Sequence, residues 1–216
     1  MGRRQTAGNL QHARCARLEV RVVEQKWGGR PTPQSLGGST PGRNATSDQP
    51  MNSPFAVIAL GSNLGDSRGL LLAAMERLAQ FSREPIQRSS LWESQPVDCP
   101  PGSPSFVNAV VRLVPEPNET PETLLAKLKQ LEQTFGRQPK RVLNEPRPLD
   151  LDLLAFGNEK RSTPELTLPH PRAHLRAFVL APLAELDPDY HLAGQQKTAT
   201  ELLAEVTQEG LVRLTT

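Results

Sequence analysis

Runs of apolar residues begin at Phe55 and predict a series of strands and helices along the rest of the chain. The segment FAVIALGSN, residues 55–63, is a short apolar run followed by small and polar residues, as is typical of a buried strand that leads into a loop. Asp66 or Ser67 can cap a helix that follows it. The apolar residues of this helix recur at helical spacing, at Leu70, Leu71, Ala74, Leu78 and Phe81.

Two more strands and a second helix are predicted next. The segments IQRSSLWES (86–94) and SFVNAVVRLV (105–114) are strand-like. The proline-rich loop between them, 95–104, is too long for a tight hairpin turn, so we interpret it as a candidate active-site loop. The second helix has Thr120 as its N-cap, followed directly by proline, and Gly136 at its C-terminal cap.

The segment NEPRPLDLDLLAFG, residues 144–157, reads as a strand that carries two carboxylates on one face. Side chains alternate along a strand, so three leucines share one face while Asp150 and Asp152 share the other. At a spacing of roughly 7 Å and an intermediate dielectric, two such charges cost on the order of 2 kcal/mol. Either this polar face is wet and water screens the pair, or a cation site offsets the repulsion.

The order of elements is β-α-β-β-α-β, which predicts an α+β fold: a ferredoxin-like sandwich with two helices on one face of an antiparallel sheet. From Asn158 onward we expect a C-terminal extension of short elements, around LTLPHPRAHLRAFVLAPLAEL and TATELLAEV. Residues 54–216 are therefore expected to form a single domain.

Residues 1–53 differ in composition from the rest of the chain. They carry eight Lys or Arg and three acids, and subtracting this +5 from the net charge of +2 leaves −3 for residues 54–216. The second half of this segment is rich in Pro, Gly, Ser and Thr, which predicts a disordered extension. A start at Met51 with an over-extended upstream region, or a targeting segment, are the alternatives that the composition leaves open.

Composition also excludes several functional classes. A body with a charge of −3 argues against nucleic-acid binding, and no apolar run reaches the roughly 18 to 20 residues of a membrane span. The two cysteines, Cys15 and Cys99, provide neither a disulfide framework nor a zinc motif. We expect a cytoplasmic monomer that acts on small molecules.

A cationic loop precedes the carboxylate pair. Between Gly136 and Pro148 stand four basic residues and one acid, Glu145; the basic residues are Arg137, Lys140, Arg141 and Arg147. A solvated loop is the simple interpretation. Next to two aligned carboxylates, however, such a loop is typical of a nucleoside triphosphate site, in which carboxylates hold Mg²⁺ and basic residues neutralise phosphates. His170, between two prolines, has a stiff backbone and a fixed ring direction.

Several motifs together resemble one family. ALGSNLGD, FVNAV, PRPLDLDLLAFG and LTLPHPRAHLRAFVLAPLAEL occur in the order and at the spacings of the 6-hydroxymethyl-7,8-dihydropterin pyrophosphokinases of folate synthesis, over about residues 55–190. The resemblance implies a ferredoxin-like fold. It also implies transfer of the pyrophosphoryl group of ATP to the hydroxymethyl group of a dihydropterin, with release of AMP.

The resemblance also implies residue roles. Asp150 and Asp152 would bind two Mg²⁺ ions, and Arg137 and Arg147 would be catalytic. The residues implied for ATP binding are Glu132, Arg137, Lys140, Arg147, His170 and Arg176. Those implied for the pterin are the aromatic pair Phe106 and Phe178, the edge-binding Asn108, and the loop residues Ser94, Pro96 and Val97.

The chain departs from the family pattern in both loops. Pro139, Leu143 and Asn144 replace an arginine and an Arg-Trp pair, and Arg141 is a candidate compensation. In the pterin loop, Trp92 replaces a tyrosine, Ser94 a threonine and Asp98 a glycine. These changes bear on how the loops close.

Two other functions fit parts of the pattern. RNA-recognition modules share the β-α-β-β-α-β order, but they stack bases on several aromatic residues of their central strands, where this chain offers only Phe55 and Phe106. A metal-dependent phosphoesterase would use the aspartate pair to activate water, and it would not need Phe106, Asn108 and Phe178.

Overall fold

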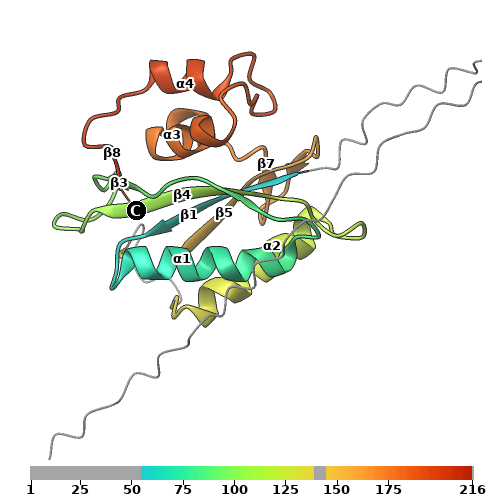
Figure 1. The fold of residues 1–216 in the computed structure, drawn as a ribbon, viewed down its shortest axis with the longest axis horizontal. Coiled ribbons are helices and arrows are strands. Elements are labelled where there is room, and N and C mark those ends of the chain that lie inside the picture. Colours follow the sequence, from blue (N-terminus) through green and yellow to red (C-terminus); the bar gives the residue numbers. More distant parts are fainter. Residues whose placement is uncertain (1–54, 139–144, 216) are drawn as a thin grey trace, which may run out of the picture. The chain divides into compact units, whose positions relative to one another are not determined.

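The fold is built on an antiparallel sheet. The computed structural model describes residues 55–138 and 145–215. In this part of the chain the main strands, in sheet order, are β5 (Asp150–Phe156), β1 (Ala56–Ser62), β4 (Phe106–Leu113) and β3 (Trp92–Ser94). The first strand thus lies between the last and the third, which is the ferredoxin-like order, and the predicted fold class is confirmed (Figure 1).

Helices α1 (Ser67–Leu78) and α2 (Pro121–Thr134) cover one face of the sheet (Figure 1). Their predicted caps are confirmed. Asp66 accepts a hydrogen bond from the first turn of α1, and Thr120 does the same for α2. Gly136 ends α2 with a φ of +88°, a left-handed conformation that glycine adopts without a steric penalty.

Strand β5 has the predicted division of its side chains. Leu149, Leu151 and Leu153 are buried in the core between the sheet and the helices α1 and α2. Asp150 and Asp152 lie on the opposite face. The alternation of the sequence therefore decides which face of the sheet carries the carboxylates.

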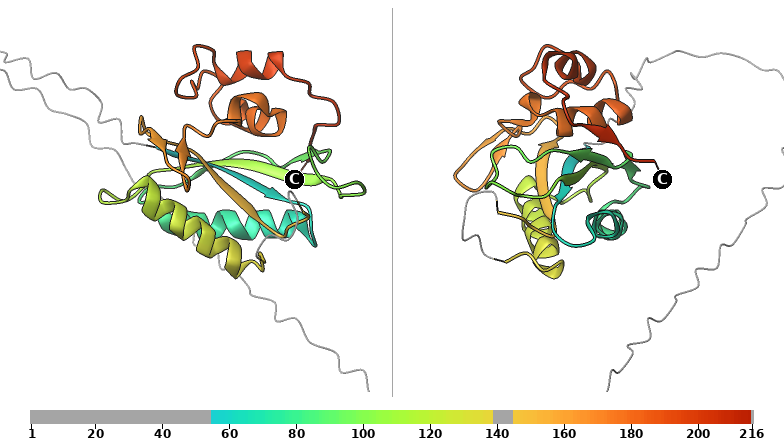
Figure 2. Two further views of the ribbon diagram at one scale, coloured as in Figure 1. Left: turned by 180° about the vertical axis from the view of Figure 1, so that it is seen from behind. Right: turned by 90° about the vertical axis from the view of Figure 1, so that its left-hand side faces the viewer.

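That opposite face is covered in part by the C-terminal helices α3 (Ala177–Leu186) and α4 (Ala199–Glu205), as Figure 2 also shows. Val57, Val110 and Leu154 are buried beneath them in a second core. The sequence predicted short elements here but not that they cover this face. RNA-recognition modules stack bases on the corresponding face of the sheet, and here α3 and α4 occupy part of that face.

The predicted strand at 86–94 is wrong in one respect: it forms two short strands, β2 (Gln87–Arg88) and β3. The break has a physical cause in the residue between them, Ser89. Its N–H donates to the Val110 carbonyl, 3.0 Å, and its Oγ accepts from the Val110 N–H, also 3.0 Å. The hydroxyl thus takes the place of a backbone carbonyl in the pairing with β4. Between β2 and β3 the chain has one residue more than the opposite stretch of β4, as in a β-bulge.

Smaller elements complete the fold. They are the 3₁₀ turns 79–81 and 173–175, the pair β6 (Arg161–Ser162) and β7 (Thr167–Leu168), and the C-terminal strand β8 (Val212–Arg213), which pairs with β3. Phe81, predicted within the first helix, lies in the first of these turns. Among the described residues no helix is long and apolar enough to cross a membrane. The predicted extension at 1–53 lies outside the described residues.

Two neighbouring leucines of α1 test this packing. Leu71 is fully buried, whereas Leu72 is 41 % exposed. We expect Leu71→Ala to lower the free energy of unfolding by about 2–5 kcal/mol, because it leaves a cavity in the core. Leu72→Ala should cost less than about 1 kcal/mol. Urea unfolding of both variants measures the difference, and equal losses would contradict the described orientation of α1.

Candidate active site

The candidate site lies where α3 and α4 leave the sheet uncovered. Strand register brings its central residues together: Gly61 of β1 is opposite Asn108 of β4 on one side and Asp150 of β5 on the other. Two positions back in β1, Ala59 is opposite Asp152. Because Gly61 and Ala59 are small, a hollow remains above the central strand.

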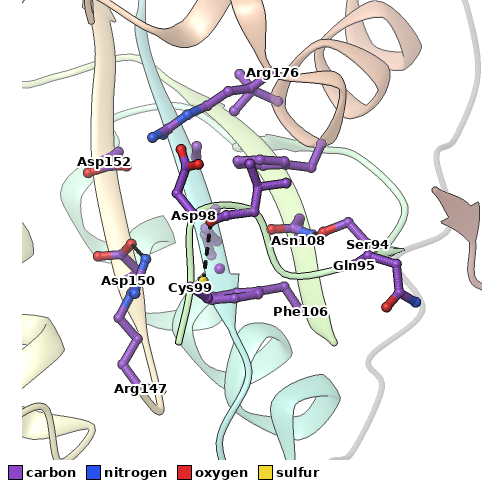
Figure 3. Close-up of a pocket in the computed structure, with 16 residues that line it drawn as sticks. Ser94, Gln95, Asp98, Cys99, Phe106, Asn108, Arg147, Asp150, Asp152 and Arg176 are labelled. Carbon is purple, nitrogen blue, oxygen red and sulfur yellow. Dashed lines mark hydrogen bonds and ion pairs between the residues drawn. The ribbon is translucent and has the colours of Figure 1, made fainter. Parts of the chain in front are cut away.

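A first pocket occupies this hollow (Figure 3). Phe106 from β4 and Phe178 from α3 line it, and the loop after β3 forms another part of its wall. The lining residues of that loop, with the end of β3, are Ser94, Gln95, Val97, Asp98 and Cys99. A pocket with two aromatic rings and a few polar groups is suited to a flat heterocycle.

Asn108 lies at the base of the first pocket and is held in one orientation. Its Nδ2 donates to the Ser94 Oγ, 2.9 Å, and to the Trp92 carbonyl, 3.4 Å. Its Oδ1 lies on the pocket side, 3.6 Å from the point where a Cβ on Gly61 would stand. The side chain therefore presents an acceptor to an N–H group of a bound ring.

A second pocket lies on the other side of the aspartates and is rich in charge. It is lined by residues of α2 and the turn after it, of β5, and of the segment 165–176, among them Lys129, Glu132, Arg137, Glu165, His170 and Arg172. Both pockets share four residues: Arg147, Asp150, Asp152 and Arg176. The carboxylate pair thus stands at the boundary between an aromatic pocket and a cationic one.

The two shared arginines also touch the aromatic rings. The guanidinium carbon of Arg147 lies 5.3 Å from the centroid of the Phe106 ring, and that of Arg176 lies 5.4 Å from the centroid of Phe178. Both distances fall within the range of a cation–π contact. Each arginine therefore connects the aromatic pocket with the cationic one.

Asp150 is held by two arginines. One carboxylate oxygen pairs with Arg137, and the other accepts from Arg147 at 2.6 Å. Burial favours the neutral acid, but the charges of Arg147 and Arg137 outweigh it and lower the pKa of Asp150. Asp150 is therefore ionised at neutral pH.

Asp152 has the opposite electrostatic balance. Burial, and then the negative charge of Asp150, raise its pKa, while His170 and Arg176 act against this shift. Among the described residues no hydrogen bond or ion pair to the side-chain carboxylate of Asp152 is found. A cation between the two carboxylates would relieve their repulsion.

Glu132 connects α2 to the start of β5. Its Oε1 accepts from Arg137 at 2.5 Å and from the Leu151 N–H at 2.7 Å. Burial raises the pKa of Glu132 to about 7, although the hydrogen bond from Leu151 and the charge of Arg137 each lower it. Glu132 therefore positions Arg137, the same arginine that pairs with Asp150.

The donor atoms suit a hard dication. Asp150 and Asp152 supply carboxylate oxygens, which Mg²⁺ prefers. In the described part of the chain no group of three or more His, Cys, Asp or Glu side chains is arranged to hold a metal ion. Two carboxylates with the remaining ligands taken from phosphate and water are the usual arrangement for Mg²⁺ in nucleotide sites. The residues thus fit Mg²⁺ bound together with a polyphosphate.

Most residues singled out from the sequence lie at these pockets. Pro96 lies in the same loop but does not line the first pocket, and Lys140 is outside the described residues. Sequence reasoning missed several lining residues: Ala59, Gly61, Gln95, Cys99, Leu125, Lys129, Glu165, Thr167 and Val179. Of these, Gln95 and Cys99 lie in the loop 95–104 that the sequence marks as a candidate active-site loop, and Gly61 directly follows an apolar run.

Comparison with known proteins agrees with this geometry. A family model described as 7,8-dihydro-6-hydroxymethylpterin-pyrophosphokinase (HPPK) matches residues 57–188. The chain is 38 % identical over 160 residues to the 2-amino-4-hydroxy-6-hydroxymethyldihydropteridine pyrophosphokinase of Haemophilus influenzae, covering 74 % of this chain and 97 % of that protein. It is 40 % identical over 161 residues to the protein of the same name from Pseudomonas aeruginosa, covering 73 % and 94 %.

Solved structures show the same fold. An HPPK-DHPS chain of Plasmodium falciparum matches with a TM-score of 0.56 and 15 % identity over 74 % of this chain. Another HPPK-DHPS crystal structure, in complex with substrates, matches with a TM-score of 0.55 and 13 % identity. This chain spans less than half of those two chains, 46 % and 43 %.

The fold and the two adjoining pockets define a protein with a ferredoxin-like sheet, and the family match assigns it to the transferases. The agreement in sequence extends over more than half of the chain, and the chain belongs to the 7,8-dihydro-6-hydroxymethylpterin-pyrophosphokinase (HPPK) family. It is thus a pyrophosphokinase of folate synthesis.

The raised pKa of Glu132 makes stability depend on pH. The folded protein holds the proton up to about pH 7, and the unfolded chain loses it near 4.5, so stability from this group is full below pH 4.5 and is lost as pH rises through 7. Glu132→Gln should remove this loss. In urea unfolding with a chelator, we expect the stability of the variant relative to wild type to rise by roughly 3 kcal/mol between pH 4.5 and pH 8, because each unit of the raised pKa corresponds to about 1.4 kcal/mol. A constant difference over this range would contradict the raised pKa.

Proposed function

We propose that the chain transfers the pyrophosphoryl group of Mg²⁺-bound ATP to the hydroxymethyl group of 6-hydroxymethyl-7,8-dihydropterin and releases AMP. The observation that carries this proposal is the wall shared by the two pockets, formed by Arg147, Asp150, Asp152 and Arg176. Donor and acceptor bound on its two sides would meet at the carboxylate pair.

The first pocket is proposed to bind the pterin. Phe106 and Phe178 would cover the two faces of the ring, and Asn108 would accept a hydrogen bond from its edge. Burying such an edge without a partner costs roughly 1–3 kcal/mol for each polar group, so the fixed orientation of Asn108 favours a ring with an N–H donor. Ser94, Pro96 and Val97 would belong to the loop beside it.

The second pocket is proposed to bind ATP. Arg137, Arg147, Arg176 and His170 surround it, and a triphosphate needs this density of positive charge. Glu132 would act here by holding Arg137. Lys140 is proposed as a further phosphate ligand because of its position in the family motif.

Asp150 and Asp152 are proposed to hold two Mg²⁺ ions along the phosphates, which would neutralise charge on the oxygens. In the reaction, the pterin hydroxyl oxygen bonds to the β-phosphorus and loses its proton, which is released to water. The bond from this phosphorus to the oxygen that bridges to the α-phosphorus breaks, and AMP leaves. Arg147 and Arg176, at the boundary of the pockets, would bind the group in transfer and stabilise the charge that develops on it.

We also propose that one copy of residues 54–216 is the functional unit. The family match, residues 57–188, lies within this range. Cytoplasmic location remains a prediction.

The direct test is to incubate the protein with ATP, Mg²⁺ and the hydroxymethyl dihydropterin and to separate the nucleotides. AMP and the pterin diphosphate in equal amounts are expected. ADP would indicate attack at the γ-phosphorus, and free phosphate without a pterin product would indicate a phosphoesterase. Either result would overturn the proposal.

The two aspartates should respond differently to substitution. Asp152→Asn removes a repelling charge, so with a chelator present we expect unchanged or higher thermal stability and a loss of kcat of at least about 1,000-fold. Asp150→Asn removes the partner of Arg137 and Arg147, so we expect a similar loss of kcat and a lower melting temperature. Calorimetry and initial rates measure both, and wild-type turnover in either variant would exclude the metal site.

The aromatic pair should affect the pterin and not the nucleotide. We expect Phe178→Ala to raise the KM for the pterin by about 10-fold or more, because one stacking face is lost, with less than about a two-fold change in the KM for ATP. Leu175→Ala is the control, since Leu175 is 61 % exposed and lines neither pocket. Equal changes in both KM values would argue against stacking.

A deletion tests the domain proposal. Residues 1–50 lie outside the family match, so a chain without them should keep the kcat and melting temperature of the full chain. The truncated and full-length proteins are compared by initial rates and calorimetry. An unfolded or inactive product would show that the segment contributes to the enzyme.

A further inference from the structure

A second polar cluster lies outside both pockets, centred on Glu185 near the end of α3. Its Oε1 accepts from the Ser90 N–H at 3.1 Å, the Ser90 Oγ at 2.7 Å and Arg213 at 2.8 Å. Its Oε2 accepts from the indole Nε1 of Trp92 at 3.0 Å. One carboxylate thus joins helix α3, strand β3 with Ser90 two residues before it, and the C-terminal strand β8.

The strand that Glu185 holds leads directly to the first pocket. Trp92 begins β3 and Ser94 ends it. The Trp92 carbonyl and the Ser94 hydroxyl are the two acceptors for Nδ2 of Asn108. The geometry of Asn108 therefore depends on where β3 lies.

Strand β3 is short and lies next to the edge of the sheet, between β4 and the two-residue strand β8. It is only three residues long, the bulge at Ser89 precedes it, and the loop 95–104 follows it. Segments with few backbone hydrogen bonds open locally at low free-energy cost. On its outer side β3 pairs with β8, where the Leu214 N–H donates to the Leu91 carbonyl at 2.8 Å. Arg213 of β8 is the residue that pairs with Glu185.

We propose that Glu185 is a positioning residue for the pterin subsite: through Ser90 and Trp92 it fixes β3, and β3 fixes Asn108. This inference rests on the proposed function, because it takes the first pocket as the pterin site. In the described part of the chain, the hydrogen bonds and ion pair of Glu185 reach no residue that lines the second pocket, so we expect its effect on the acceptor substrate.

The cluster requires a carboxylate. Every group that faces Glu185 is a donor, and both of its oxygens are used. Glutamine has nearly the same shape, but its amide nitrogen would face either the Trp92 N–H or the donors from Ser90 and Arg213. Glu185→Gln should therefore release one side of the cluster without leaving a cavity.

A carboxylate two residues further along provides a matched control. Asp187, just after α3, pairs with Arg112 of β4 at 2.7 Å and holds the same helix to the sheet without contacting β3. We expect Glu185→Gln to raise the KM for the pterin by about 5-fold or more, with less than about a two-fold change in the KM for ATP. Asp187→Asn should change neither. Equal effects of the two variants would indicate that Glu185 only helps to hold α3 on the sheet, and this result would overturn the proposal.

Trp92 supplies a readout that does not depend on turnover. Trp27 is the other tryptophan of the chain, so Trp27→Phe leaves Trp92 as the only indole. In this background, Glu185→Gln should increase quenching of Trp92 fluorescence by acrylamide, and Asp187→Asn should not. Unchanged quenching overturns the positioning role whether or not the enzyme turns over. Absence of AMP from the wild type would instead overturn the proposed function.

A double-mutant cycle tests whether the indole transmits the effect. Trp92→Phe keeps the ring packing and removes the N–H that Glu185 binds. If Glu185 acts through this bond, the KM for the pterin in the double variant should be little higher than in the single variant with the larger effect. If the fold-change in the double variant equals the product of the two single fold-changes, the two residues act independently. This result would contradict the proposal that Glu185 acts through Trp92.

Discussion

The rest of the site depends on one electrostatic constraint: two carboxylates on the same face of one strand, both partly removed from water. Asp150 is ionised because Arg137 and Arg147 bind it, and its charge in turn raises the pKa of Asp152. Glu132 is placed to hold the first of these arginines. The cationic groups and the carboxylates thus balance each other before any substrate binds, and a dication with a polyphosphate would add nearly matched charges to this balance.

The sheet places these two carboxylates between two pockets. Its second face is covered by α3 and α4 at one end and left open at the other, where glycine and alanine in the central strand make room. Phe178 and Arg176 stand at the start of α3, so the helix that closes the core also supplies one wall of each pocket. The position of α3 on the sheet therefore sets the width of the aromatic pocket.

The sequence predicted the elements that short-range patterns specify. The caps at Asp66 and Thr120, the leucine face of β5 and the order of strands are local signals, and the structure confirms them. Long-range features carry no such signal. Glu185 and Trp92 are 93 residues apart in sequence, and the hydroxyl of Ser89 that interrupts a predicted strand acts through a partner 21 residues away. Alternation shows which face a side chain takes, but it does not show what covers that face.

The C-terminal strand β8 has a further consequence for how this protein behaves among its neighbours. An open edge of a sheet offers unpaired backbone groups to any other chain, and natural sheets block such edges with short charged strands. With Arg213 paired to Glu185, the two-residue strand β8 occupies the outer edge of β3 and leaves only a short stretch of backbone for another strand to pair with. The ion pair that holds β8 against α3 therefore also helps to keep this edge of the sheet closed to other chains.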